Sequence, residues 1–113
     1  WKFATHRHFR LIAHIAALDT PWHDKKDVAI FRGELTGAKG NYEKRRSDVD
    51  NCNRMIRCRL AYKFANSKYV DAKLTSMRKR LPPVINGRTL QSGKIALQQM
   101  LKYKGIVMIE GND

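Results

Sequence analysis

Apolar and polar residues are arranged along this chain in segments that predict three strands. Residues 28–31 are apolar and partly β-branched, which is typical of a buried strand. Residues 68–75 alternate between apolar and polar side chains, and residues 105–109 form a third, strongly apolar run. Residues 33–50 are rich in glycine and charge, and residues 78–90 contain Pro-Pro and Asn-Gly, so we expect both segments to be loops.

Three other segments have approximately helical spacing of their apolar residues. The first is residues 7–18. The second is expected to begin near Asp50 or Asn51, which are both good helix caps, and to continue as one helix through the sequence CNRMIRCRLAYKFA. The third covers residues 91–102, with Ser92 as its candidate cap.

The predicted elements therefore follow the order helix, strand, loop, helix, strand, helix, strand. Alternation of this kind predicts an α/β fold with a largely parallel sheet. Ligands of such sheets bind outside the carboxyl ends of the strands. Charged residues mark three such ends, at Arg32-Gly33, at Asp71 and at Glu110-Gly111-Asn112.

The first of these ends has residues suited to a phosphate group. Gly33 allows a backbone to approach a ligand closely, and the guanidinium of Arg32 can bind a phosphate through two hydrogen bonds. Thr36 could add a hydroxyl. Neither a Walker loop nor a GxGxxG sequence is present. On these residues alone, Arg32-Gly33 is either a phosphate-binding corner or a plain turn.

The other two ends are also open to two interpretations. Glu110, followed by Gly111 and Asn112, could accept hydrogen bonds from a ribose or sugar hydroxyl, or it could be a solvated acid in a turn. Asp71 lies within an apolar run, where we expect it to cap a helix or pair with a lysine.

The length and the net charge of the chain limit the kinds of protein that it can be. The 113 residues are sufficient for a single domain, and no apolar run reaches the ~18 residues needed to span a bilayer. The net charge is +13, and no acid occurs between Asp71 and Glu110. This excess predicts either an anionic partner or a solvated basic face. On the second predicted helix, Arg54, Arg57 and Lys63 are expected to face solvent.

The cysteines and histidines predict neither a disulfide nor a metal site. Cys52 and Cys58 are six residues apart, which corresponds to ~9 Å along a continuous helix, so we expect buried free thiols. No CxxC is present, and the four histidines are not spaced as zinc ligands.

Two blocks of sequence resemble glycosyltransferase family 90, which includes the protein O-glucosyltransferases and the capsule-associated xylosyltransferases. Residues 20–37, TPWHDKKDVAIFRGELTG, are similar to the family's Trp-x-x-Lys-Lys … Phe-Arg-Gly-x-x-Thr-Gly block. Residues 101–113, LKYKGIVMIEGND, resemble its Tyr-Lys-Tyr … Asp/Glu-Gly-Asn strand. The blocks stand in family order, the similarity covers residues 20–113, and it is closest to the algal and protist branch.

The resemblance implies a Rossmann-like, three-layer α/β fold, with residues 1–113 forming a single partial domain. This domain would be the donor-binding half of a GT-B enzyme that transfers glucose or xylose, with inversion, from UDP-glucose or UDP-xylose to a protein or glycan hydroxyl. The implied diphosphate ligands are Arg32, Gly33, Thr36 and Gly37. Those implied for the nucleotide or sugar are Glu110, Gly111 and Asn112. No cofactor or metal is expected.

The resemblance also implies parts that this sequence lacks. The catalytic base is expected in the acceptor-binding half, so the fragment should be inactive by itself. Family members are membrane-anchored proteins of the secretory pathway, in the lumen of the endoplasmic reticulum or Golgi. Two alternatives from the residues themselves are a small basic nucleic-acid-binding module, although no nucleic-acid motif is present, and a segment that only docks on the missing half.

Overall fold

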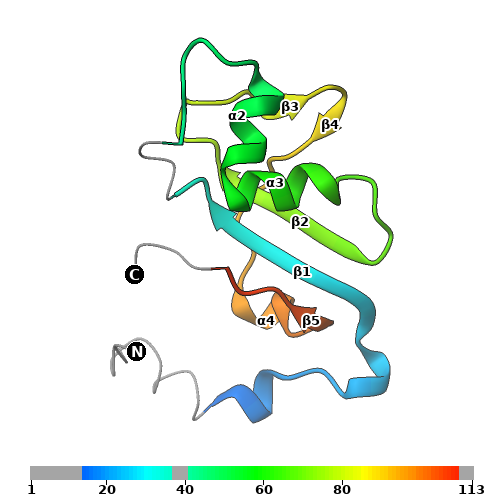
Figure 1. Ribbon diagram of the computed structural model, residues 1–113. Helices are drawn as coiled ribbons and strands as arrows, with labels where there is room; N and C mark the ends of the chain where they lie inside the picture. The colour runs from blue at the N-terminus through cyan, green and yellow to red at the C-terminus, as the bar shows by residue number, and fades with distance from the viewer. Residues whose placement is uncertain (1–13, 37–40, 110–113) are drawn as a thin grey trace.

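The computed structural model describes residues 14–36 and 41–109 of the chain, of which residues 14–18 are helical (Figure 1). The further elements, in chain order, are the 3-10 helix η1 (Trp22–Asp24), β1 (Lys26–Glu34), α2 (Asp48–Arg54), α3 (Ile56–Lys63), β2 (Val70–Ser76), β3 (Val84–Ile85), β4 (Arg88–Thr89), α4 (Leu97–Met100) and β5 (Tyr103–Ile106).

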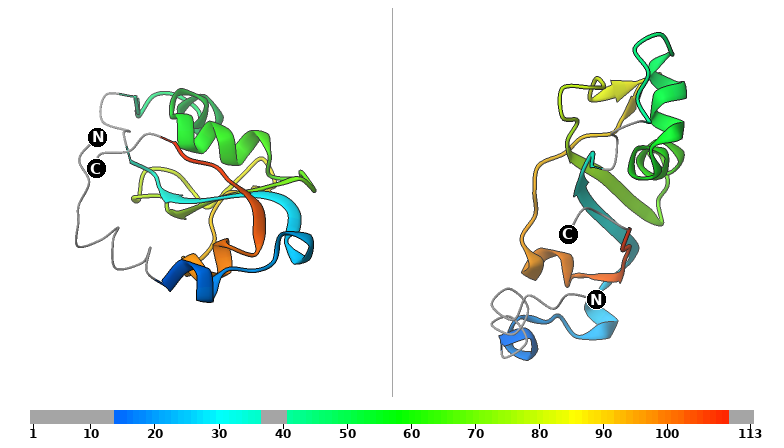
Figure 2. Two further views of the ribbon diagram at one scale, coloured as in Figure 1. Left: turned by 90° about the horizontal axis from the view of Figure 1, so that it is seen from below. Right: turned by 60° about the vertical axis from the view of Figure 1, so that its left-hand side comes forward.

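The predicted α/β fold with a parallel sheet is confirmed. Three strands form one sheet in the order β2-β1-β5, and β1 pairs in parallel with both neighbours. The connection from β1 to β2 passes through α2 and α3. The connection from β2 to β5 passes α4 and returns on the other side of β1. Figure 2 shows α3 on one side of the sheet and α4 on the other, which is compatible with a Rossmann-like, three-layer arrangement.

The two faces of the sheet differ in composition because side chains alternate along each strand. The face under α2 and α3 is apolar and belongs to the main core, with Phe31 and Leu35 from β1 and its end and Ala72 and Leu74 from β2. The alternate positions of β2 are Asp71, Lys73 and Thr75, and those of β1 include Arg32 and Glu34 with the fully buried Ile30. The second face is therefore largely polar, which is unusual for a parallel sheet.

The expected free thiols are wrong, because Cys52 and Cys58 form a disulfide. The predicted single helix is interrupted at Met55, whose extended backbone (φ −110°, ψ 112°) separates α2 from α3. This break brings the two Cα atoms to 5.0 Å, where a continuous helix would hold them ~9 Å apart. Both cysteines are completely buried beside Met55.

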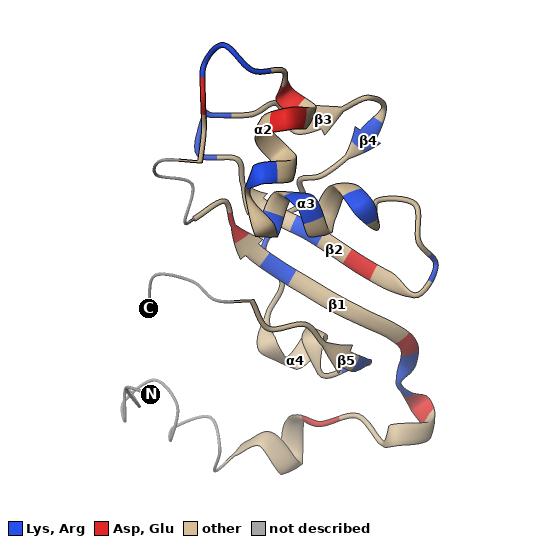
Figure 3. Ribbon diagram, in the orientation of Figure 1, with Lys and Arg blue, Asp and Glu red and all other residues tan. Residues whose placement is uncertain are grey.

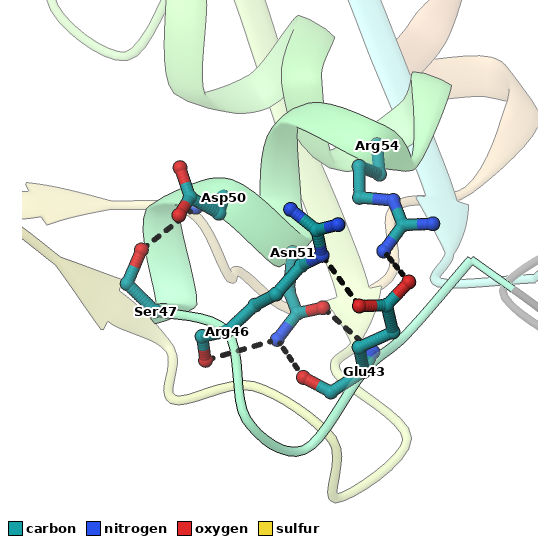
Figure 4. A network of polar contacts seen from close by, with 6 residues as sticks. All are labelled: Glu43, Arg46, Ser47, Asp50, Asn51 and Arg54. Carbon is teal, nitrogen blue, oxygen red and sulfur yellow. Dashed lines mark hydrogen bonds and ion pairs between the residues drawn. The ribbon is translucent and has the colours of Figure 1, made fainter.

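A buried asparagine fixes the loop before α2 (Figure 4). The Asn51 side chain accepts a hydrogen bond from the Glu43 N–H (2.8 Å) and donates to the carbonyls of Glu43 (2.9 Å) and Arg46 (3.4 Å). Ser47, rather than Asp50 or Asn51, is the N-cap, and its hydroxyl accepts from the Asp50 N–H. Asn51 therefore joins the loop to the helix instead of capping it.

Ion pairs complete this network on the outside. The Glu43 carboxylate contacts Arg46 and Arg54, and hydrogen bonds from Arg54 and then Arg46 lower the pKa of Glu43 below its ordinary value. Arg54 was correctly expected on the surface, but its guanidinium is bound to the loop.

Other element boundaries also differ from expectation. Residues 78–90 include the short antiparallel hairpin β3-β4, and the Asn86-Gly87 turn has positive φ at both residues, as a tight hairpin turn requires. The predicted helix over 91–102 is wrong for its first half. Gln91 instead forms a bridge to Leu74 of β2, and α4 has Ala96 rather than Ser92 at its N-cap.

Candidate functional site

The guanidinium of Arg32 lies on the polar face of the sheet and binds Asp71 of the adjacent strand. Its Nη1 donates to Asp71 Oδ1 (3.0 Å) and its Nη2 to Asp71 Oδ2 (2.8 Å), while Nη1 also reaches the Phe31 and Asp71 carbonyls. The Arg32 side chain is 12% exposed and that of Asp71 is 32% exposed. Asp71 thus has the structural role that we expected, although with an arginine instead of a lysine.

Gly33 lies within β1, one residue before its end, so Arg32-Gly33 is not a turn. Positive φ angles in the described residues occur at Arg78, Lys79, Asn86 and Gly87, and not at Gly33. Close packing accounts for the glycine. A Cβ there would lie 3.0 Å from Phe31 Cζ and 3.4 Å from an Nη of Arg57. The glycine allows these two side chains to lie over the end of β1.

Two predicted ligands carry buried polar atoms that have no partner in the part of the chain that the structure describes. They are Arg32 Nε and Thr36 Oγ1. Buried polar atoms in native proteins are nearly always hydrogen-bonded, so each of these two atoms is expected to have a partner beyond the described residues, such as water, an ion, a ligand group or another part of the chain. Both atoms belong to residues at the carboxyl end of β1, where the sequence predicted a ligand.

A cavity of about 270 Å³ opens on the polar face at this end of the sheet. Its walls combine the predicted Arg32 and Gly33 with residues that the sequence did not indicate, and the whole set is Arg32, Gly33, Glu34, Thr75, Lys94, Ile95 and Met100. The hydroxyl of Thr75 and the ammonium of Lys94 are both suited to an anionic group. The volume is below the 300–1,000 Å³ typical of whole-ligand pockets, so it matches only part of a nucleotide-sized ligand.

Residues of both charges line this cavity, and Figure 3 shows acidic and basic positions close together at the end of β1. Glu34 forms ion pairs with Arg78 and, at 4.0 Å, with Lys94. Lys94 is 79% exposed, so this long contact leaves its ammonium free to turn toward a bound anion. Arg32 is already paired with Asp71, so Lys94 is the cation of the cavity wall that is best placed to meet a bound anion.

Arg57 is the residue that the sequence-based interpretation misplaced. We expected it to face solvent, but it is half-buried and reaches across the carboxyl end of the sheet. Its two Nη atoms donate to the carbonyls of Glu34 (3.1 Å) and Ile109 (3.3 Å). It therefore ties the end of β1 to the segment that follows β5. No motif in the sequence near Lys94 or Thr75 marked them as residues of the site. The alternation of residues 71, 73 and 75 could, however, have placed Thr75 on the same face of the sheet as Asp71.

The remaining predicted ligands, Gly37, Glu110, Gly111 and Asn112, lie outside the described residues. Within residues 14–36 and 41–109, no three His, Cys, Asp or Glu side chains are grouped as metal ligands. No helix in that part of the chain is long and apolar enough to cross a membrane.

Comparison with known proteins identifies no relative of this chain. No protein-family model matches the sequence, and neither a curated protein nor a solved structure matches it. The site therefore has to be interpreted from its own residues and from the sequence resemblance described above.

Proposed function

We propose that the chain is part of an inverting glycosyltransferase, and that the cavity at the carboxyl end of β1 binds the diphosphate of a UDP-sugar donor. The observation that carries the proposal is that Arg32 and Gly33, from the Phe-Arg-Gly-x-x-Thr block of the family resemblance, line this cavity together with Thr75 and Lys94. The parallel sheet supports it, because ligands of such sheets bind outside the carboxyl ends of the strands, and the cavity is lined by residues near the carboxyl ends of β1 and β2.

The chemistry follows from the charges at this end of the sheet. When the bond between sugar and diphosphate breaks, negative charge grows on the diphosphate oxygens. Fixed donors aimed at these oxygens lower the barrier, because they stabilise the charge as it develops. The Asp71 carboxylate holds the Arg32 guanidinium at the cavity wall, and Lys94 brings a second cation to the same wall. Arg57 would act as a positioning residue that holds the end of β1 against the segment after β5.

The family resemblance assigns the catalytic base to an acceptor-binding half, for which this sequence has no counterpart. In the proposed GT-B enzyme, the described residues form one wall of the active site. We therefore expect the 113-residue chain to bind UDP weakly and to transfer no sugar.

A location in the secretory pathway is part of the proposal. The buried Cys52–Cys58 disulfide supports it, because disulfides persist in oxidising compartments such as the lumen of the endoplasmic reticulum and are rare in the cytosol.

Calorimetric titration of the chain with UDP and with uridine tests the proposed function. UDP should bind and uridine should bind at least about tenfold more weakly, because uridine lacks the diphosphate. Lys94→Ala should weaken UDP binding several-fold. Lys68→Ala is the matched control, since Lys68 is an exposed lysine just before the amino end of β2 and should have no effect.

Two results would contradict the proposal. One is equal binding of uridine and UDP; the other is an equal effect of the two lysine variants. A single-stranded oligonucleotide that binds more tightly than UDP, with an affinity that falls steeply with salt, would favour the basic nucleic-acid-binding module instead.

A further inference from the structure

An apolar groove lies away from the candidate site, between the outer side of α3 and the segment that follows β5. Its volume is about 530 Å³. Apolar residues from both elements form its floor, namely Ile56, Leu60, Phe64, Val107 and Ile109. Ile56 is 56% exposed, although isoleucine is among the residues most often buried. A concave apolar surface with an exposed anchor of this kind is typical of a site for a partner chain.

Two cations, Arg59 and Lys63, border this groove, and no carboxylate belongs to its walls. Both side chains are exposed, and neither has an ion-pair partner within the described part of the chain. Lys63 contacts the Phe64 ring at 5.6 Å. By contrast, Arg32, Arg54 and Arg78 each pair with a carboxylate elsewhere in the molecule. The groove thus combines apolar surface with uncompensated positive charge.

Among the described strands, β5 forms one edge of the sheet, and the segment that follows it lines the groove. β5 is the outer strand on its side of the sheet, and among the described strands it pairs only with β1. Val107, just after β5, still pairs with β1 through its N–H, which donates to the Ile30 carbonyl at 2.9 Å. The pairing with β1 thus continues one residue beyond β5, to a residue that lines the groove.

We propose that this groove docks an extended peptide segment of a partner protein in which apolar and acidic residues alternate. Its apolar side chains would cover Ile56 and Phe64, and its carboxylates would pair with Arg59 and Lys63. Charge complementarity argues against a second copy of this chain, since two chains of net charge +13 repel one another. The concave shape favours a peptide over the flat surface of a bilayer.

Fluorescence anisotropy with a labelled octapeptide that alternates valine and glutamate tests this proposal on the 113-residue chain. We expect saturable binding, and Arg59→Glu should weaken it about tenfold because the charge facing the peptide is reversed. Arg45→Glu is the matched control, since Arg45 is exposed, undergoes the same charge change and does not line the groove. Ile56→Asp should weaken binding without any change at a basic residue.

Three results would overturn the proposal. The first is an equal effect of Arg59→Glu and Arg45→Glu, which would show attraction to net charge alone. The second is equal binding of a peptide with the same composition but its four valines contiguous. The third is tight binding to phosphatidylserine vesicles that is lost in Arg59→Glu while the octapeptide does not bind, which would identify the groove as a membrane contact.

Discussion

The two faces of the three-stranded sheet are built from neighbouring residues of the same strands, yet they are organised by different interactions. Leu74 is fully buried in the main core under α2 and α3, whereas Thr75, the next residue, lines the cavity on the opposite face. Helices α2 and α3 contribute buried side chains to the first face, while α4 contributes none to the second.

This difference suggests that one face of the sheet serves mainly stability, while the other is available for the binding proposed above. Burial of apolar side chains stabilises the face under α2 and α3. The other face has the Arg32–Asp71 pair and a cavity, which stabilise a fold little and which we propose as the binding site of an anionic ligand. Substitutions on the two faces should therefore change the free energy of unfolding by different amounts.

The largest effect is expected for Leu74→Ala, which removes a fully buried side chain from the apolar face. The free energy of unfolding should fall by about 2–5 kcal/mol because transfer energy is lost and a cavity remains. Thr75→Ala, one residue away on the polar face, should change it by less than about 1 kcal/mol. Urea denaturation of both variants measures the difference, and similar losses would show that the two faces are not distinct.

The disulfide should contribute the next largest amount on the apolar face. Cys52→Ala combined with Cys58→Ala is expected to lower the free energy of unfolding by about 2 kcal/mol, because the cross-link closes a loop of six residues. Urea denaturation of the variant, with and without reductant, measures this. Reductant should destabilise the parent chain and leave the variant unchanged. A parent chain that is insensitive to reductant once its thiols are shown to be reduced would contradict the expected role.

On the polar face, a double-mutant cycle with Arg32→Met and Asp71→Asn should give a coupling energy of about 1–2 kcal/mol. The value is smaller than for a core residue because the Asp71 side chain is about one third exposed, so solvent screens the pair. Denaturation of the four proteins provides the cycle. Additive effects of the two substitutions would mean that the pair does not hold the Arg32 guanidinium.

The smallest effect concerns Glu43, which lies outside the sheet. Its pKa is lowered in the folded chain by Arg54 and Arg46, so the unfolded chain binds more protons in the acidic range. Its contribution to stability is therefore present above its ordinary pKa and is lost as the pH falls through the lowered value. Glu43→Gln should make stability less dependent on pH between about 5 and 3. If thermal melts of Glu43→Gln showed the same pH dependence as those of the parent chain, Glu43 would not have this role.

The sequence was sufficient to predict the class of fold, because helical and strand-like segments alternate and the strands are apolar. It was not sufficient to predict the break between α2 and α3 at Met55. Residues 50–65 have acceptable helical spacing throughout, and only the packing of α2 and α3 over the sheet, with the cysteines side by side, selects the interruption. Similarly, the bridge between Gln91 and Leu74 is a long-range contact that overrides the local helical pattern of residues 91–96.

The candidate site was predicted in part for the same reason. Arg32, Gly33 and Thr36 are neighbours in the chain and form a motif, so they could be identified from the sequence. Lys94, Thr75 and Arg57 come from other segments and meet the end of β1 only through the order of the strands. Nor could the sequence indicate why Gly33 is a glycine, which depends on the positions of Phe31 and Arg57.

The central claim is that the polar face at the carboxyl end of β1 binds the diphosphate of a UDP-sugar. It is tested most directly by the amide chemical shifts of the isotope-labelled chain during titration with UDP. We predict the largest changes at Arg32–Thr36, Thr75 and Lys94, and much smaller changes on α3 around Arg59. Changes confined to α2, α3 or the β3-β4 hairpin, with residues 32–36 unaffected, would contradict the account.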